Sequence, residues 1–309
     1  MKRTIIKDAL THCYQRSADK GVIFYTVSDH LLYFTILCVI APRYGVRILK
    51  VVEMPDHLHH GAIEERRGAL SDLLRDVNSV FAREYNRGTG HCGPVFEHSF
   101  GSAAKTDSKK CRSLLIYLDN NPVERHLVKQ AEEYQWNFLA YARSNHPFSD
   151  KIVLRKASMP LRRALSYVKA QHKSGHYLTL PVLKRLFNSL PDDRERDQLT
   201  DFMIVTYSVI DYRSATAYFG GYEEELIAAH ATSGSEYELK ERFVGRTDLV
   251  FNQMSAILRG RGLLKDIHEI FTLSEKRKNE LYLMLRRETD ARPQQIAAFL
   301  HLARVELSA

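Results

Sequence analysis

The stretch that decides the fold is residues 46–60, VRILKVVEMPDHLHH. Its first part, 46–52, is short, rich in β-branched residues and bounded by turn formers, which predicts a strand. In the part that follows, His57 and His59 are separated by one apolar residue. On a strand their side chains point to the same face, whereas Leu58 and His60 point to the other. Imidazoles placed in this way can bind one divalent cation, but H-x-H pairs also occur as ordinary surface or core histidines, so both interpretations stay open at this point.

A second group of polar residues lies in 114–123, LLIYLDNNPV. Tyr117 and Asn121 are four residues apart, so on a helix a phenol and an amide share one face about a turn apart. One side chain can then attack a substrate while the other helps to hold a metal ion. The alternative is a core tyrosine followed by a helix end, and residues before a proline avoid the α region, which favours placing Asn121 just past the helix.

The elements around these motifs alternate between strand and helix patterns. GVIFYTV, residues 21–27, predicts another strand, and the apolar run 31–42 predicts a buried helix because it is about half the length that crosses a membrane. Apolar residues recur at helical spacing over 69–85, and 110–118 also has a helical pattern. The order of these elements predicts an α+β domain with a small sheet and helices packed on one face.

Beyond a boundary near 145–151 the pattern is almost entirely helical. We expect helices over these ranges: 159–171, 180–189, 194–209, 223–231, 239–243, 248–259, 274–287 and 292–300. The last two have the rhythm of a helix-turn-helix, but only 305–309 is left for a recognition helix. Either the sequence given ends early or these helices form a small packing module.

Charge is concentrated at the start of this second half. Residues 151–190 contain nine Lys or Arg and no Asp or Glu, in a chain whose net charge is +8. Such a stretch suits a polyanion such as the DNA backbone, and an amphipathic helix that covers an acidic surface of the preceding domain explains it nearly as well. The four cysteines form no C-x-x-C pair and no secretory signal is visible, which predicts free thiols and a cytoplasmic protein.

Together these motifs resemble the single-tyrosine HUH transposases of insertion sequences, most closely the REP-associated tyrosine transposases. The family pattern M-P-[ND]-H-x-H corresponds to 54–59, and Y-I-H-x-N-P-V corresponds to 117–123. Further similar segments follow in the family's order over residues 10–145: RYGVRI (43–48), YNR (85–87), GPVFEHSF (93–100) and YQW (134–136). Two positions depart from the pattern. Asp119 replaces the usual histidine, which concerns the proton acceptor of the tyrosine, and Ser99 replaces an arginine, which concerns a DNA contact.

The resemblance implies a ferredoxin-like antiparallel sheet in an HUH domain, residues 1–148, followed by an all-α domain, residues 149–309. It implies a metal-dependent endonuclease and strand transferase for single-stranded, hairpin-containing DNA. Tyr117 would be the nucleophile that forms a 5′-phosphotyrosine, and His57, His59 and Asn121 would hold Mg²⁺ or Mn²⁺. Basic and aromatic residues near the motifs are the expected DNA contacts: Arg83, Tyr85, Asn86, Arg87, Lys105, Lys109, Lys110 and Arg112. We expect a cytoplasmic protein that is associated with the nucleoid and does not bind membranes. The resemblance also allows a homodimer, because in some relatives the tyrosine helix serves the partner's site.

Two other functions remain open from the sequence. One is a domesticated protein that binds repeat hairpins or regulates transcription without cutting. The other is a metal-dependent hydrolase without a covalent intermediate. Retention of Tyr117 with both histidines counts against the first, and loss of activity in Tyr117→Phe would count against the second.

Overall fold

The computed structural model describes residues 4–232 and 248–302. Its first half contains a four-stranded antiparallel sheet in the order β2-β3-β1-β4. The strands are β1 (Leu10–Arg16), β2 (Val46–Met54), β3 (His57–Glu64) and β4 (Gly101–Lys105). Strands β1 and β2 both pair with β3, which therefore separates them, and β4 pairs with the other edge of β1. This is the split β-α-β arrangement of ferredoxin-like folds, as the resemblance implied.

Helices cover both faces of this sheet, so the expectation of helices on one face alone is wrong. Helices α1 (Val27–Ile40) and α2 (Ala69–Thr89) pack on the face that carries Leu58 and Ala62. Helix α3 (Ser108–Glu124) packs on the opposite face, over Leu49, Val52 and Ile63. Three predicted elements are thereby confirmed: the strand at 46–52, the apolar helix and the helix at 69–85.

Two local features explain how α1 and α3 reach these positions. Helix α1 begins at a capping box in which Thr26 and Asp29 satisfy each other's backbone N–H groups. Helix α3 comes close to β3 because Gly61 has no side chain, and a Cβ there would lie 3.2 Å from Leu118 Cδ1. The close approach brings the tyrosine helix onto the histidine strand.

The strand predicted at 21–27 is wrong. This segment is extended but pairs with no strand among the described residues, because its N–H groups are used elsewhere. Ile23 and Phe24 donate to the Pro55 carbonyl, and Val22 donates to the Ala298 carbonyl. The first strand is instead 10–16, LTHCYQR, whose polar residues conceal its period, and the short β4 was also not predicted.

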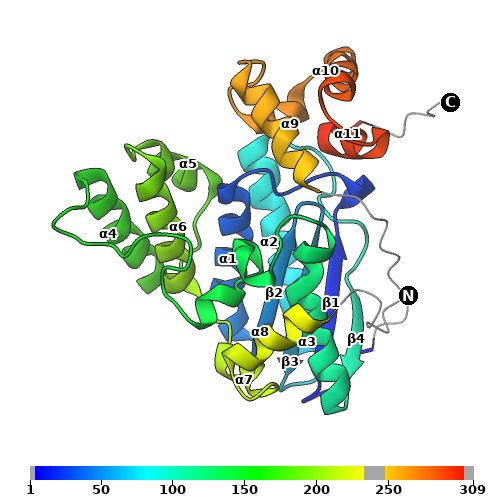
Figure 1. The fold of residues 1–309 in the computed structure, drawn as a ribbon, viewed down its shortest axis with the longest axis vertical. Helices are drawn as coiled ribbons and strands as arrows, with labels where there is room; N and C mark the ends of the chain where they lie inside the picture. Colours follow the sequence, from blue (N-terminus) through cyan, green and yellow to red (C-terminus); the bar gives the residue numbers. More distant parts are fainter. Residues whose placement is uncertain (1–3, 233–247, 303–309) are drawn as a thin grey trace.

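The second half is helical, as predicted. Its helices are α4 (Met159–Lys173), α5 (Leu180–Asn188), α6 (Asp193–Tyr207), α7 (Tyr212–Ala217), α8 (Tyr222–Ala231), α9 (Leu249–Gly260), α10 (Glu275–Glu288) and α11 (Pro293–Leu300). Figure 1 shows α4–α6 grouped beside α1, and α9–α11 at one end of the molecule. The α4–α6 side chains join the core formed by α1 and α2, so one hydrophobic core continues across residue 148. The predicted helix at 239–243 and the segment 305–309 lie outside the described residues.

Helices α9–α11 form a module with its own hydrophobic core, and this core includes Val22 of the first half. Tyr25 Oη donates to the Phe299 carbonyl at 2.6 Å, and His301 Nε2 bonds the Val22 carbonyl at 2.7 Å. The segment 22–25 is therefore held by the module on one side and by the turn before His57 on the other. No helix in the described part of the chain is both long enough and apolar enough to span a membrane.

An ionic cluster around the buried His268 also fixes this module. His268, in the 3₁₀ turn Ile267–Thr272, lies with Nε2 3.0 Å from Asp29 Oδ1 and Nδ1 2.9 Å from Asp266 Oδ1. Lys184 Nζ is 2.5 Å from Asp266 Oδ2. Burial alone would lower the pKa of His268, but the two carboxylates outweigh it and raise the pKa to about 9. The cluster joins α1, α5 and the module by charge.

Candidate active site

The two predicted histidines and the predicted tyrosine meet between β3 and α3. Strand geometry sends His57 and His59 toward α3, as expected, whereas His60 faces the other layer and bonds the Tyr33 hydroxyl at 3.0 Å. The Tyr117 ring lies edge-on to the His59 ring with 5.7 Å between centroids. The His57 and His59 rings are 4.9 Å apart.

Asn121 completes this group. It lies inside α3, which continues through Pro122 to Glu124, so the expectation that it follows the helix end is wrong. The amide Nδ2 of Asn121 is 3.4 Å from His59 Nε2. Its Oδ1 atom is buried and has no hydrogen-bond partner among the described residues. A buried amide oxygen without a partner costs stability, which makes it a candidate ligand atom.

The sequence analysis did not identify His12, which also belongs to the site. This residue of β1 points to the same face, and its Nε2 is 2.9 Å from His59 Nδ1. Its ring stacks beside His59 and meets the Tyr117 ring edge-on at 5.7 Å. Once β1 is known, the β1–β3 register would reveal it, because His12 pairs with Gly61, two residues beyond His59.

The protonation pattern suits a divalent cation. Burial, followed by the neighbouring histidines, lowers the pKa of His59 well below its usual value, so its imidazole is neutral. The contact of His59 Nδ1 with His12 and that of His57 Nδ1 with Asp56 Oδ1, at 2.6 Å, leave each Nε2 as the available ligand atom. The Asn121 amide faces His59, with Nδ2 3.4 Å from His59 Nε2, and a turn of the amide group would bring Oδ1 to the same side. The residues present therefore fit a metal ion. In the described ranges no set of three His, Cys, Asp or Glu side chains is arranged to hold a metal ion, and the candidate set here has Asn121 as its third member.

Tyr117 is completely buried, and His57 is 7% exposed. A phosphodiester cannot reach the Tyr117 hydroxyl in this conformation. Access requires a movement of α3 or of the segments that cover it.

Asp119 does not lie beside the tyrosine hydroxyl as a proton acceptor in the position of the family's histidine. It points to β2, where Lys50 Nζ is 2.5 Å from Asp119 Oδ1 and 3.0 Å from Glu225 Oε1 of α8. All three side chains are buried. Burial raises the pKa of Asp119, Lys50 opposes this, and Glu225 adds to it. Asp119 thus belongs to an ionic cluster that joins α3 and α8 to the sheet.

The predicted DNA contacts fall into two groups on opposite faces of the sheet. Lys105, Lys109, Lys110 and Arg112 lie at the end of β4 and the start of α3, on the side of Tyr117. Arg83, Asn86 and Arg87 lie on α2, behind the sheet, and Arg87 bonds Glu84. The structure contradicts the prediction that Tyr85 stacks on DNA, because this side chain is fully buried against His268 and Phe271. The helical period places Tyr85 on the core face of α2. This placement, and not the ability of its ring to stack on a base, decides where the side chain lies.

The basic stretch 151–190 forms α4, α5 and the segment before them. Among its nine cations, only Lys184 forms an ion pair with a carboxylate in the described part of the chain, and that carboxylate is Asp266. Among the described residues, no ion pair supports the explanation that this stretch neutralises an acidic surface of the first domain. Its DNA-binding role stays a prediction.

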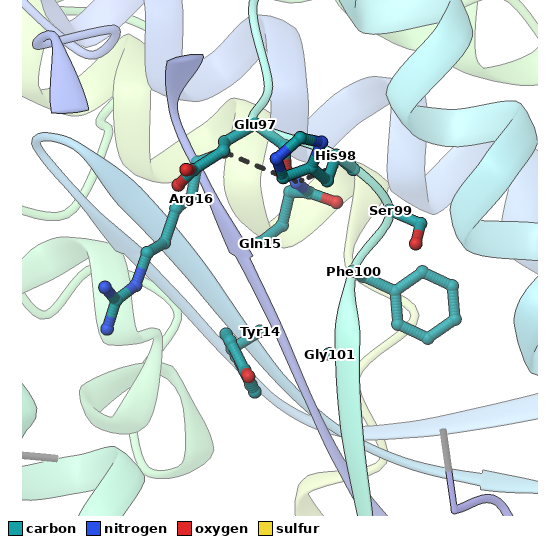
Figure 2. A pocket seen from close by; sticks show the side chains of 8 residues that line it. All are labelled: Tyr14, Gln15, Arg16, Glu97, His98, Ser99, Phe100 and Gly101. Atoms are coloured by element: carbon teal, nitrogen blue, oxygen red, sulfur yellow. Dashed lines mark hydrogen bonds between the residues drawn. The ribbon is translucent and has the colours of Figure 1, made fainter. Parts of the chain in front are cut away.

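A surface pocket with a volume of about 420 Å³ lies at the β1–β4 edge. Figure 2 shows the side chains that line it: Tyr14, Gln15, Arg16, Glu97, His98, Ser99, Phe100 and Gly101. Ser99, where the family has an arginine, is one of these residues. The pocket thus includes the second position at which the sequence departs from the family pattern.

Comparison with known proteins gives one distant structural likeness. No family model and no curated protein matches the chain. A solved structure described as a REP-associated tyrosine transposase bound to a REP hairpin is similar, with 20% identity and a TM-score of 0.38. The alignment covers 44% of this chain and 79% of that one. At this level the relationship is distant.

Proposed function

We propose that this protein is a metal-dependent endonuclease and strand transferase for single-stranded DNA, with Tyr117 as the nucleophile. The observation that carries the proposal is the convergence of His57, His59, Tyr117 and Asn121 from two separate elements into one cluster. Surface or core histidines have no need of a tyrosine and an unpartnered amide oxygen beside them. The same four positions are those that carry the motif resemblance.

The reaction follows from the chemistry of these groups. The Tyr117 hydroxyl loses its proton as its oxygen attacks the phosphorus, and the bond from phosphorus to the 3′ oxygen breaks. That oxygen takes up a proton and leaves as a free 3′-hydroxyl, while the 5′ end stays linked to Tyr117. The link preserves the energy of the phosphodiester, so a 3′-hydroxyl can later attack it and rejoin the strand without another energy source.

His57, His59 and Asn121 would hold Mg²⁺ or Mn²⁺, which when bound supplies positive charge to the phosphoryl oxygens. His12 and Asp56 orient the two imidazoles through their Nδ1 atoms. The rings of His12 and His59 flank Tyr117 and set the direction of its phenol. The chain's own contribution is thus to align the nucleophile with the ligand atoms.

A second function is favoured by one observation, the complete burial of Tyr117. A protein that binds hairpin DNA without cutting it has no need for access to the tyrosine. In that case the cluster between β3 and α3 would be a structural remnant. The two functions differ in whether a covalent adduct ever forms.

The test is incubation of the purified protein with Mn²⁺ and labelled single-stranded hairpin oligonucleotides drawn from the DNA that flanks its gene. Denaturing electrophoresis then reveals any protein–DNA adduct. We expect an adduct with the wild type that disappears in Tyr117→Phe and in chelator. Tyr207→Phe, which alters another buried tyrosine on α6, is the matched control and should keep the adduct.

Binding of the hairpins with neither adduct nor cleavage in any divalent ion would refute the enzymatic proposal and leave the binding function. Cleavage that persists in Tyr117→Phe would instead indicate a metal-dependent hydrolase without a covalent intermediate.

A further inference from the structure

The pocket at the β1–β4 edge is lined by residues of β1 that lie next to the candidate active site. In the β1–β3 register Tyr14 lies opposite His59, and Arg16 lies opposite His57. The Tyr14 ring is 5.8 Å from the His12 ring, which in turn is 5.7 Å from the Tyr117 ring. The Tyr14 ring, which lines the pocket, therefore contacts the His12 ring, and the His12 ring contacts the buried Tyr117 ring.

Tyr14 has the form of a stacking surface. Its ring lies against the backbone of β4 at Gly101, where an added Cβ would be 2.2 Å from Tyr14 Cζ. Only glycine leaves room for the ring in this position. Tyr14 is half-buried and lines the pocket, so one side of the ring is supported by β4 while the residue remains partly open to solvent.

The opposite wall of the pocket is held in place from beneath. Gln15, which is 3% exposed, donates from Nε2 to the carbonyls of Glu97 and His98 at 3.1 and 3.3 Å. Its Oε1 accepts a hydrogen bond from Asn78 at 3.1 Å. The backbone of the wall is thus fixed, while the side chains of Glu97, His98 and Ser99 are exposed at its surface.

We infer that this pocket binds one unpaired nucleotide of the DNA strand, next to the phosphate that Tyr117 attacks; this inference rests on the proposed function. The base would stack on Tyr14, since every base has a π-face and stacking needs no particular sequence. Arg16, in register with His57, would lie on the side of the nucleotide's phosphate. Glu97 and Ser99 offer hydrogen-bonding groups to the base edge. A volume of about 420 Å³ is in the range of small-ligand pockets.

The ligand class follows from this chemistry. A duplex cannot present a base to Tyr14 without opening a pair, whereas a single strand can. A free phosphate would use Arg16 but has no use for a supported aromatic ring. The pocket thus favours single-stranded over double-stranded DNA at the cleavage position.

The test measures the binding of fluorescein-labelled oligonucleotides by anisotropy, without divalent ions, so that no cleavage occurs. The probes are the hairpin oligonucleotides with a single-stranded extension and the same strand made fully double-stranded. We expect Tyr14→Leu to weaken binding of the single-stranded probe about tenfold, the effect typical of losing one base stack. Tyr14→Phe should restore it to within about twofold, because the ring is retained. Tyr44→Leu, which alters a half-buried tyrosine on the other face of the sheet, is the matched control and should bind as the wild type does.

A second measurement needs no protein variant. Abasic sites are placed one at a time along the single-stranded extension, and one of them should weaken wild-type binding by the same factor. That abasic site should cost nothing further in Tyr14→Leu, because the two changes remove the same contact.

Equal binding by Tyr14→Leu and wild type, with no sensitive abasic position, would overturn this inference. The proposed function would still stand if the wild type forms the Tyr117 adduct. Absence of both the adduct and single-strand binding would refute the proposed function, and this inference with it.

Discussion

The stability of the protein should fall steeply between pH 7 and pH 9.5 because of one histidine. His268 is buried between Asp29 and Asp266, and its pKa is about 9 against 6.5 in the unfolded chain. A group whose pKa is raised by folding stabilises the folded state fully below the unfolded pKa and loses this effect as the pH rises through the folded pKa. The difference of 2.5 pKa units corresponds to about 3 kcal/mol at low pH. Of this, about 2.5 kcal/mol is present at pH 7 and almost none at pH 9.5.

The assay is urea denaturation of the wild type and His268→Gln at pH 7 and pH 9.5. The glutamine keeps a hydrogen-bonding side chain but cannot take a charge. The unfolding free energy of the wild type should decrease by about 2.5 kcal/mol more than that of the variant over this range. Lys184, which contacts the same carboxylate of Asp266, is present in both proteins, so the comparison between them isolates the effect of His268. Parallel pH profiles for the two proteins would refute the assignment of a charged His268 to this cluster.

Three further predictions concern other charged groups. Lys50→Met should destabilise the protein by about 3–5 kcal/mol in urea denaturation, because Asp119 and Glu225 stay buried without their cation. Arg47 is an exposed cation on the same strand, so Arg47→Met should cost less than about 1 kcal/mol. Equal costs for the two variants would contradict a special role for the buried cluster. His12→Ala should weaken Mn²⁺ binding by about 10- to 100-fold in calorimetry, since it removes the group that orients His59. His146 is exposed, so His146→Ala should have no effect on this affinity. Unchanged affinity in His12→Ala would show that His12 does not position the His59 imidazole. Replacing Lys156, Arg162 and Arg163 by Ala should reduce the slope of log affinity against log salt by roughly 2–3 for the hairpin oligonucleotides. Ala at Arg194 and Arg196, which are ion-paired, should leave this slope nearly unchanged. A larger change of slope in the second variant than in the first would place the DNA elsewhere on the protein.

The sequence predicted which residues of the candidate site lie together better than it predicted the strands around them. His57 and His59 were identifiable because alternation along a strand is a local property, and Tyr117 and Asn121 because helical spacing is another. His12 was not identifiable, since its role depends on the pairing of β1 with β3, a contact between residues far apart in the chain. For the same reason GVIFYTV was taken for a strand: its composition favours one, but its N–H groups bond to the Pro55 and Ala298 carbonyls instead.

The burial of single residues was also beyond reach of the sequence. Tyr85 was predicted to be a DNA contact from its neighbours Asn86 and Arg87, although the helical period places it on the core face of α2. Its complete burial comes from the helical module, whose His268 and Phe271 rings cover it. Asp119 became part of an ionic cluster only through Glu225, which is more than a hundred residues away. Both outcomes depend on tertiary packing that local patterns do not encode.

The two-sided anchoring of residues 22–25 has a consequence for how the protein is made. Tyr25 and its acceptor Phe299 are 274 residues apart in the chain. At a synthesis rate of about 5–20 residues per second, the ribosome needs roughly 15–55 seconds to make the second after the first. Throughout that interval the segment that supports the turn before His57 lacks its outer half, and Val22 and Tyr25 stay uncovered. The full set of contacts around the segment that supports the turn before His57 thus forms only after the last helices have been made.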